Sequence, residues 1–286
     1  MTTRTPSTQI YGSPAYAVSA LPAYRGGAPA WTPADVTVSA SITWEVLDAS
    51  GTMYGDVAHT TPITANNDPI GAIPTLRGAT IQHRATEFWL PRNSNMTYAP
   101  VLKTTDATYS RVVACVADSL KEMVPGGIFD DAAQNIYLSE DAFMFAIRIK
   151  HHIDAASAFG ELVFLGYDFA SSSGPGFLVG DSTYTKYKVG PRSGAFTGTG
   201  VERVATDVWS TVVMLVTGSG TSLYLNDPVT PVYTNAGLTP LQYTGRSIGF
   251  GTLNASQAIS FRRFIVGSNF NAAEAPIAGV MSWLEG

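Results

Sequence analysis

Hydrolysis of a glycoside needs two carboxylic acids that flank one bond, so closely spaced acids are the first candidate residues. A strand reading E-x-D-x-x-E would set its first two acids on one face, since side chains alternate along a strand. The sequence contains no such run. Its nearest acid pairs, Asp130-Asp131 and Glu140-Asp141, are adjacent residues that would point to opposite faces of a strand. We interpret both pairs as loop acids exposed to solvent.

Histidine and serine chemistry is equally weakly indicated. His151 and His152 are neighbours on an expected strand, so they would not bind one ion. His59 and His83 lack further ligands at the spacing of a zinc site. No His/Asp arrangement for serine chemistry is evident in the sequence. We therefore expect no catalytic residue, no metal-binding residue and no enzymatic activity.

The composition narrows the class of protein. The chain has 286 residues, of which 45% are hydrophobic, so it can bury a full core. Only 14% of its residues are charged, against roughly 25% in typical soluble domains. The net charge of −5 and the lack of a Lys/Arg stripe argue against nucleic-acid binding. The single cysteine, Cys115, cannot form an internal disulfide, and its apolar neighbours predict a buried thiol.

Residues 1–35 differ from the rest of the chain. Five prolines forbid a helix there and interrupt sheet pairing. The segment also carries four aromatic residues, Tyr11, Tyr16, Tyr24 and Trp31. Ordinary disordered linkers are poor in aromatics, so we predict an extended arm that binds a partner through these four residues. The alternative is an unattached tail. The chain's start has no secretory signal pattern, and no run of about 18 apolar residues suggests a membrane span.

The rest of the chain alternates apolar and polar residues in the manner of strands. Residues 36–48 and 143–153 each put apolar side chains on one face. Residues 209–217 and 221–227 flank a Gly-Ser-Gly turn, which predicts a hairpin. Both faces of residues 209–217 are largely apolar, which predicts that this strand is covered on both sides. Turn signals every 8 to 12 residues are typical of a sandwich or barrel. We therefore expect an all-β fold.

Two segments favour helices. Residues 107–124 place apolar side chains at helical spacing after Asp106, a possible cap, although their first half is rich in β-branched residues. We expect a helix there, or a strand running into a helix. Near the C-terminus, Asn271 can cap a short helix whose apolar face packs back onto the sheets. That face would carry Ile277, Val280, Met281 and Leu284.

The C-terminal half resembles the concanavalin A-like lectin/glucanase (laminin-G-like) superfamily. The resemblance covers residues 143–286 and rests on Trp209, the hairpin through Asn226, Ile248-Gly249, residues 261–266 and residues 270–274. Asp227 stands where the family usually has glycine. The resemblance implies a concanavalin A-like jelly-roll sandwich over residues 36–286, preceded by the extended arm of residues 1–35.

The resemblance also implies ligands that such modules bind. Calcium could be held by loop acids and amides, for which Asp168, Asp181 and Asn226-Asp227 are available. Glycans bind exposed aromatics on concave sheet faces, and the candidate residues are Tyr184, Tyr187, Tyr224, Tyr233 and Tyr243. We expect no obligatory cofactor and treat calcium as an open possibility.

A second resemblance lies in residues 51–73. The stretches 60–65 and 68–71 are similar to a segment of bacteriophage and prophage proteins that precedes a lectin-like sandwich. The box that usually follows is replaced here by PTLRGATIQHRA. Together the resemblances imply a phage virion protein, of the capsid decoration or head-fibre type, that forms a homo-oligomer and contacts capsid or other virion proteins. The alternatives are a carbohydrate-binding adhesion module for host glycans and, third, a depolymerase or glycosidase.

Overall fold

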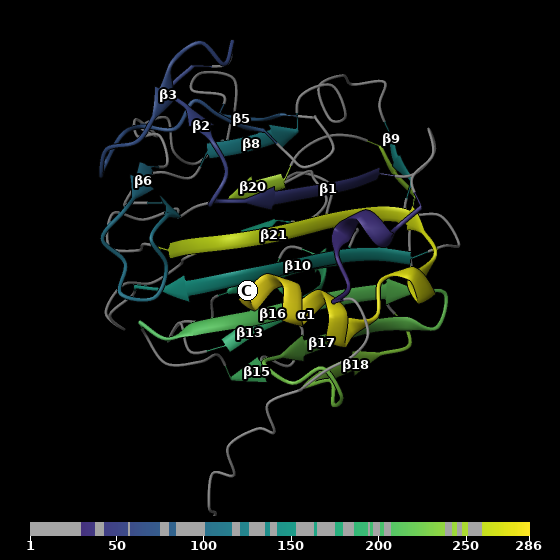
Figure 1. Cartoon of the computed structure of the whole chain (residues 1–286). Coiled ribbons are helices and arrows are strands. Elements are labelled where there is room, and N and C mark those ends of the chain that lie inside the picture. The colour runs from purple at the N-terminus through teal and green to yellow at the C-terminus, as the bar shows by residue number, and fades with distance from the viewer. Residues whose placement is uncertain are drawn as a thin grey trace, which may run out of the picture. The chain divides into compact units, whose positions relative to one another are not determined.

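A computed structural model gives the fold of this chain (Figure 1). It describes residues 30–37, 43–56, 58–74, 80–83, 101–115, 121–125, 135–137, 142–152, 163–164, 175–179, 186–193, 195–196, 201–202, 207–237, 242–244, 248–250 and 259–286. Contacts divide the chain into Met1–Ala30 and Trp31–Gly286. The described helices and strands all lie in the second unit. Most of the predicted arm, residues 1–29, lies outside the described residues.

The main sheet has eight strands in the described part of the chain, in the order β18-β17-β16-β10-β21-β7-β6, with β1 also paired to β21. All of its pairings are antiparallel. Its strands are β1 (Thr43–Asp48), β6 (Val101–Lys103), β7 (Val112–Cys115), β10 (Ala142–His151), β16 (Trp209–Thr217), β17 (Gly220–Leu225), β18 (Tyr233–Asn235) and β21 (Ile259–Phe270).

The remaining strands form smaller groups. The second sheet has the order β11-β20-β8-β5-β4-β2-β3. It comprises β2 (Met53–Tyr54), β3 (Pro62–Ile63), β4 (Ala72–Pro74), β5 (Thr80–His83), β8 (Lys121–Pro125), β11 (Val163–Phe164) and β20 (Ile248–Phe250). The other strands are β12 (Pro175–Val179), β13 (Lys186–Ser193), β14 (Ala195–Phe196), β15 (Val201–Glu202), β9 (Asn135–Tyr137) and β19 (Gln242–Thr244). The helical elements are η1 (Pro33–Asp35), η2 (Ala272–Glu274) and α1 (Ile277–Glu285).

The predicted hairpin is confirmed as β16 and β17. Thr217 pairs with Gly220, which leaves two residues in the turn. Gly220 has a φ of 121°, a backbone conformation that other residues rarely adopt. An added Cβ there would lie 2.4 Å from the carbonyl oxygen of Asn235. The turn therefore requires glycine for both its conformation and its close neighbour.

The inner face of the main sheet carries the larger hydrophobic core. Alternate residues of β10, including Phe145 and Ile147, are buried in it, together with Met214 of β16. Met53 and Ile73, from strands of the second sheet, belong to the same cluster. The core therefore lies between two antiparallel sheets, as in a β-sandwich, and the predicted all-β class is confirmed.

The outer face of the main sheet is covered by the C-terminal helix. Figure 1 shows α1 lying across β10 and β16, and these elements are in contact. Val280, Met281 and Leu284 of α1 pack with Val213 and other outer-face residues in a second cluster. This confirms both the predicted helix face and the prediction that the strand of residues 209–217 is covered on both sides. Asn271 caps η2, the short turn that precedes α1, rather than α1 itself.

Two predicted element boundaries are wrong. Residues 107–124 contain the strands β7 and β8 in their described parts, and no helix. The β-branched side chains there are placed by sheet pairing: Val112 pairs with Lys103 on one side, and Val113 pairs with Phe261 on the other. The strand predicted from residue 36 does not include Val36 or Thr37, which follow η1; residues 38–42 lie outside the described residues, and the described strand β1 begins at Thr43. No helix in the described part of the chain is long and apolar enough to cross a membrane.

We expect the side chain of Asp56, between β2 and β3, to titrate near pH 2 in the folded chain. The backbone N–H groups of Thr60 and Thr61 donate to its two oxygens at 3.0 and 2.7 Å, and they lower its pKa from 3.8 to about 2. A lowered pKa stabilises the fold above the unfolded value, and that contribution is lost as the pH falls from about 4 to about 2. Carboxyl NMR titration, with Asp56→Asn as the assignment control, measures the midpoint. A midpoint near 3.8 would contradict this turn.

Candidate functional site

The four predicted partner-binding aromatics are only partly described. Tyr11, Tyr16 and Tyr24 lie outside the described residues. Trp31 is half-buried on the outer-face cluster, and its indole Nε1 donates a hydrogen bond to the carbonyl oxygen of Glu274 at 2.7 Å. Its role in binding a partner stays a prediction.

Three further contacts fix the chain just after Trp31. The indole Nε1 of Trp44 donates to the carbonyl oxygen of Pro33 at 3.0 Å. The backbone N–H of Thr37 donates to the Glu274 side chain at 2.6 Å. Gly279 of α1 leaves room for Trp31, since an added Cβ would lie 2.7 Å from the Trp31 Cβ. We call these contacts around Trp31, Pro33 and Thr37 the arm clamp, because they fix the end of the predicted arm against the C-terminal elements.

Beyond the C-terminal end of α1, the outer face of the main sheet becomes polar. Arg148 of β10 donates to the hydroxyl oxygens of Tyr109 and Thr211 at 3.1 and 2.9 Å. Thr211 in turn donates to the carboxylate of Glu285 at 2.8 Å, and the Tyr109 hydroxyl donates to the Glu285 carbonyl oxygen at 3.1 Å. This network holds the end of the helix on the sheet.

Asp106 is the centre of this polar region. It accepts hydrogen bonds from Lys150, from the backbone N–H groups of Thr108 and Tyr109 at 2.8 and 3.0 Å, and from the indole of Trp209 at 3.3 Å. Burial alone would raise the pKa of Asp106, but these hydrogen bonds and the Lys150 charge outweigh it and hold the pKa below its usual value. Trp209 also packs edge-on against Tyr109 at 4.9 Å and lies 5.0 Å from the Lys150 ammonium.

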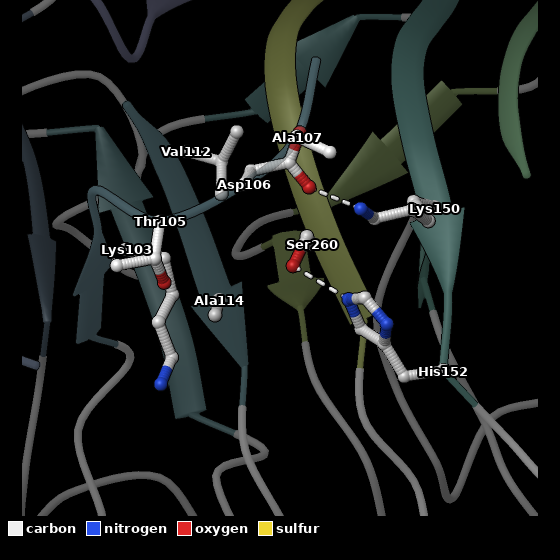
Figure 2. Close-up of a pocket in the computed structure, with 9 residues that line it drawn as sticks. All are labelled: Lys103, Thr105, Asp106, Ala107, Val112, Ala114, Lys150, His152 and Ser260. Carbon is white, nitrogen blue, oxygen red and sulfur yellow. Dashed lines mark hydrogen bonds and ion pairs between the residues drawn. The ribbon is translucent and has the colours of Figure 1, made fainter. Parts of the chain in front are cut away.

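A pocket of about 380 Å³ lies next to Asp106 on this face (Figure 2). Its volume is within the range of ligand-binding clefts. Its lining combines polar side chains with a larger apolar surface, and the lining residues are Lys103, Thr105, Asp106, Ala107, Val112, Ala114, Lys150, His152 and Ser260. These residues come from β6, the loop after it, β7, β10 and β21. The pocket could therefore hold a small molecule with both polar and apolar groups.

Two residues of the lining, His152 and Ser260, belong to a hydrogen-bonded chain of three side chains that Asp207 completes. The imidazole Nε2 of His152 lies 2.8 Å from the hydroxyl oxygen of Ser260, and its Nδ1 lies 2.6 Å from a carboxylate oxygen of Asp207. Figure 2 shows His152 and Ser260 directed at each other across the strands. No such arrangement was evident in the sequence, because the three residues lie far apart along the chain.

The other candidate ligand residues are separated or engaged elsewhere. His151 is buried on the opposite side of β10 from His152, as predicted for neighbours on a strand. Asn226 accepts from the Thr211 backbone N–H at 2.7 Å, and Asp227 accepts from that of Val229 at 2.8 Å. Among described residues, no group of three or more His, Cys, Asp or Glu side chains could hold a metal ion.

Several predicted site residues lie outside the described part of the chain. The side chains of Cys115, His83, Tyr187 and Tyr243 lie outside the described set, as do the whole residues Tyr184, Asp168, Asp181, Asp130-Asp131 and Glu140-Asp141. Of the glycan candidates that are described, Tyr224 packs on the outer-face cluster and Tyr233 packs against the inner core. Both contribute to packing within the fold.

Comparison with known proteins gives no family. No protein-family model matches the chain, and no curated protein matches it. The binding domain of Paraclostridial Mosquitocidal Protein 1 superposes with a TM-score of 0.49 at 12% identity, over 74% of this chain and 49% of that one. Trypanosoma rangeli sialidase with 2,3-difluorosialic acid gives 0.49 at 9% identity, over 87% and 34%. The botulinum neurotoxin serotype G binding domain gives 0.44 at 9%, over 84% and 50%. This chain thus spans half or less of each, and likenesses of this size assign neither family nor function.

Proposed function

We propose that this chain is a structural protein of a bacteriophage particle, of the capsid decoration or head-fibre type, that attaches through its N-terminal arm. The observation that carries the proposal is the arm clamp. Trp31 and Thr37 both bind Glu274, and Gly279 makes room for the indole. A tether needs a fixed origin on the domain that it holds, and the clamp supplies one at the C-terminal end of the arm.

Two features of the sequence support the same role. The segment similar to phage proteins contributes Ile63 and Ile70 to the inner core, so it belongs to the fold of this chain. The low charged fraction of 14% suits extensive protein contact, since charged residues are depleted at interface centres. We expect capsid or other virion proteins and further copies of this chain as partners, a location in the virion, and a non-enzymatic role.

Deleting residues 1–30 tests the tether while leaving the arm clamp intact. We expect the truncated chain to fold with an unchanged melting temperature, since the clamp and both hydrophobic clusters lie after residue 30. Its copy number in assembled particles should fall about tenfold or more, the effect of losing ~1.4 kcal/mol of binding free energy. Quantitative mass spectrometry of purified particles measures the copy number.

The matched variant keeps the full length and replaces Tyr11, Tyr16 and Tyr24 with alanine. If these aromatics make the contact, this variant should lose attachment as the deletion does. Normal incorporation of the truncated chain would reject the tether. Specific glycan binding by the same truncated chain would then favour the second candidate, a carbohydrate-binding module, for which the pocket lined by Asp106, the hydrogen-bond partner of Trp209, is the supporting observation.

A further inference from the structure

We propose that Ser260 is a nucleophile that accepts the acyl group of a small carboxylic ester in the pocket, with His152 as its base and Asp207 as the residue that positions His152. This activity does not rest on the structural role, and it would replace the non-enzymatic part of that proposal. The proposal rests on the order and lengths of two hydrogen bonds, Ser260 to His152 Nε2 at 2.8 Å and His152 Nδ1 to Asp207 at 2.6 Å. A serine nucleophile, its base and the acid behind the base are recognised by this geometry rather than by sequence position.

The strand order explains how distant residues meet. His152 follows directly on β10, which lies between β21 and β16 in the main sheet. Ser260 is on β21 and pairs with Lys150, two residues before His152, so all three side chains share the outer face. Asp207 reaches from the other side, just before β16, and its backbone N–H donates to the carbonyl oxygen of His151 at 2.7 Å. Each partner is therefore held by a paired strand or a backbone hydrogen bond.

The bonding pattern sets the proton positions. A carboxylate only accepts hydrogen bonds, so the Nδ1 of His152 carries a proton toward Asp207. In the neutral imidazole the Nε2 then has a free lone pair and accepts the hydrogen bond of the Ser260 hydroxyl. This is the tautomer that a base needs to take the serine proton.

The proposed reaction balances with the ester and water alone. The Ser260 oxygen bonds to the carbonyl carbon while its proton passes to the Nε2 of His152. The bond between that carbon and the alkoxy oxygen breaks, and His152 gives the proton to the departing alcohol. Water then hydrolyses the acyl-serine by the same path and releases the carboxylic acid. The lining contains two cations, Lys103 and Lys150. We assign the stabilisation of the oxyanion to Lys150, which lies directly opposite Ser260 in the strand pairing and is also ion-paired with Asp106.

The pocket limits the substrate to a small acyl group. Its volume of about 380 Å³ is near the lower end of ligand clefts. Val112 and Ala114 provide an apolar part of the lining on β7, beside Ser260, since Ala114 pairs with Ser260. A short-chain ester therefore fits both the size and the mixed polarity of the lining.

A fluorophosphonate probe tests the proposal on the full chain. Attack by the serine oxygen displaces fluoride from phosphorus and leaves a covalent phosphonyl-serine, which peptide mass spectrometry locates. We expect labelling of the wild-type chain at Ser260, and none in Ser260→Ala. The control Ser222→Ala, on β17, should label like wild type. His152→Asn should slow labelling by about 10²–10⁴-fold, the usual contribution of a general base.

The variant Asp207→Asn distinguishes a loss of His152 positioning from a loss of folding. Asp207 is 71% exposed and has a φ of 61°, which asparagine also tolerates, so this variant should keep its melting temperature. Its labelling should nevertheless slow, because an amide no longer selects the required imidazole tautomer. Absence of label on the folded wild-type chain, label on a residue other than Ser260, or equal rates for Asp207→Asn and wild type would each overturn the proposal, whether or not Ser260→Ala folds. Labelling at Ser260 would replace the expectation of a non-enzymatic chain.

Discussion

Phe145→Ala lowers the free energy of unfolding by about 3–5 kcal/mol, the usual cost of emptying a phenylalanine site in a core. Phe145 is fully buried on β10, the strand between β16 and β21, and pairs with Met214 and Val266. Strands β16 and β21 hold the backbone of Phe145 on both sides. The surrounding side chains therefore cannot move in to fill the cavity that the missing ring would leave. Urea unfolding monitored by circular dichroism measures the change as a lower midpoint with an unchanged slope.

The control for this experiment is Val229→Ala. Val229 is 82% exposed, so its replacement should change stability by less than ~0.5 kcal/mol. If Phe145→Ala cost no more than Val229→Ala, the inner core would not lie where the two sheets meet.

Asp106→Asn should lower the free energy of unfolding by about 3 kcal/mol, because it leaves a shielded cation without its counter-charge. The Asp106 side chain is 6% exposed and that of its partner Lys150 is 13% exposed. The asparagine side chain can still accept a hydrogen bond from the backbone N–H groups of Thr108 and Tyr109. Toward the Lys150 ammonium, however, it offers either an NH₂ group or an uncharged oxygen in place of the carboxylate. Thermal and urea unfolding at pH 7 measure the loss.

The matched control is the same substitution at an exposed site. Asp207→Asn removes a charge from a side chain that is 71% exposed, and should cost less than ~1 kcal/mol. Acid provides a second check. The lowered pKa of Asp106 means that its contribution is present above about pH 3.8 and lost as the pH falls through the folded-state value. The difference between wild type and Asp106→Asn should therefore shrink in acid, and a constant difference would contradict the charge pair.

Most of the correct predictions came from the alternation of side chains between the two faces of a strand. The hairpin was predictable because both faces of residues 209–217 are apolar, and the structure covers one with the second sheet and the other with α1. The C-terminal helix was predictable from the spacing of Val280, Met281 and Leu284. The helix expected over residues 107–124 failed, because its apolar spacing also suits short strands whose partners are remote in sequence.

The neighbours Arg262 and Arg263 make a contact that the alternation of side chains along a strand does not predict. Strict alternation would put these neighbours on opposite faces, but β21 shifts its register against β10 between Ile147 and Ile149. Both guanidinium groups consequently reach Asp48, at 2.6 and 2.7 Å. A local register shift depends on the partner strand, so no local pattern predicts it.

The grouping of Ser260, His152 and Asp207 was missed for a related reason. The histidine is 108 residues from the serine and 55 from the aspartate, so only the strand order brings them together. One signal was present: Arg148, Lys150 and His152 place polar side chains on alternate positions of an otherwise apolar strand. That pattern marks a polar end on the outer face, although it does not name the partners.

The arm clamp has a mechanical consequence. Trp31 and Thr37 are bonded to Glu274, in the turn before α1, whereas β1 is paired along β21 from Thr43 to Asp48. Tension applied through residue 30 would therefore reach the C-terminal turn and helix before it sheared the β1–β21 pairing. Under load, η2 and α1 would detach and unfold first. The chain between the arm and the sheets would become longer, while the two sheets kept their hydrophobic core.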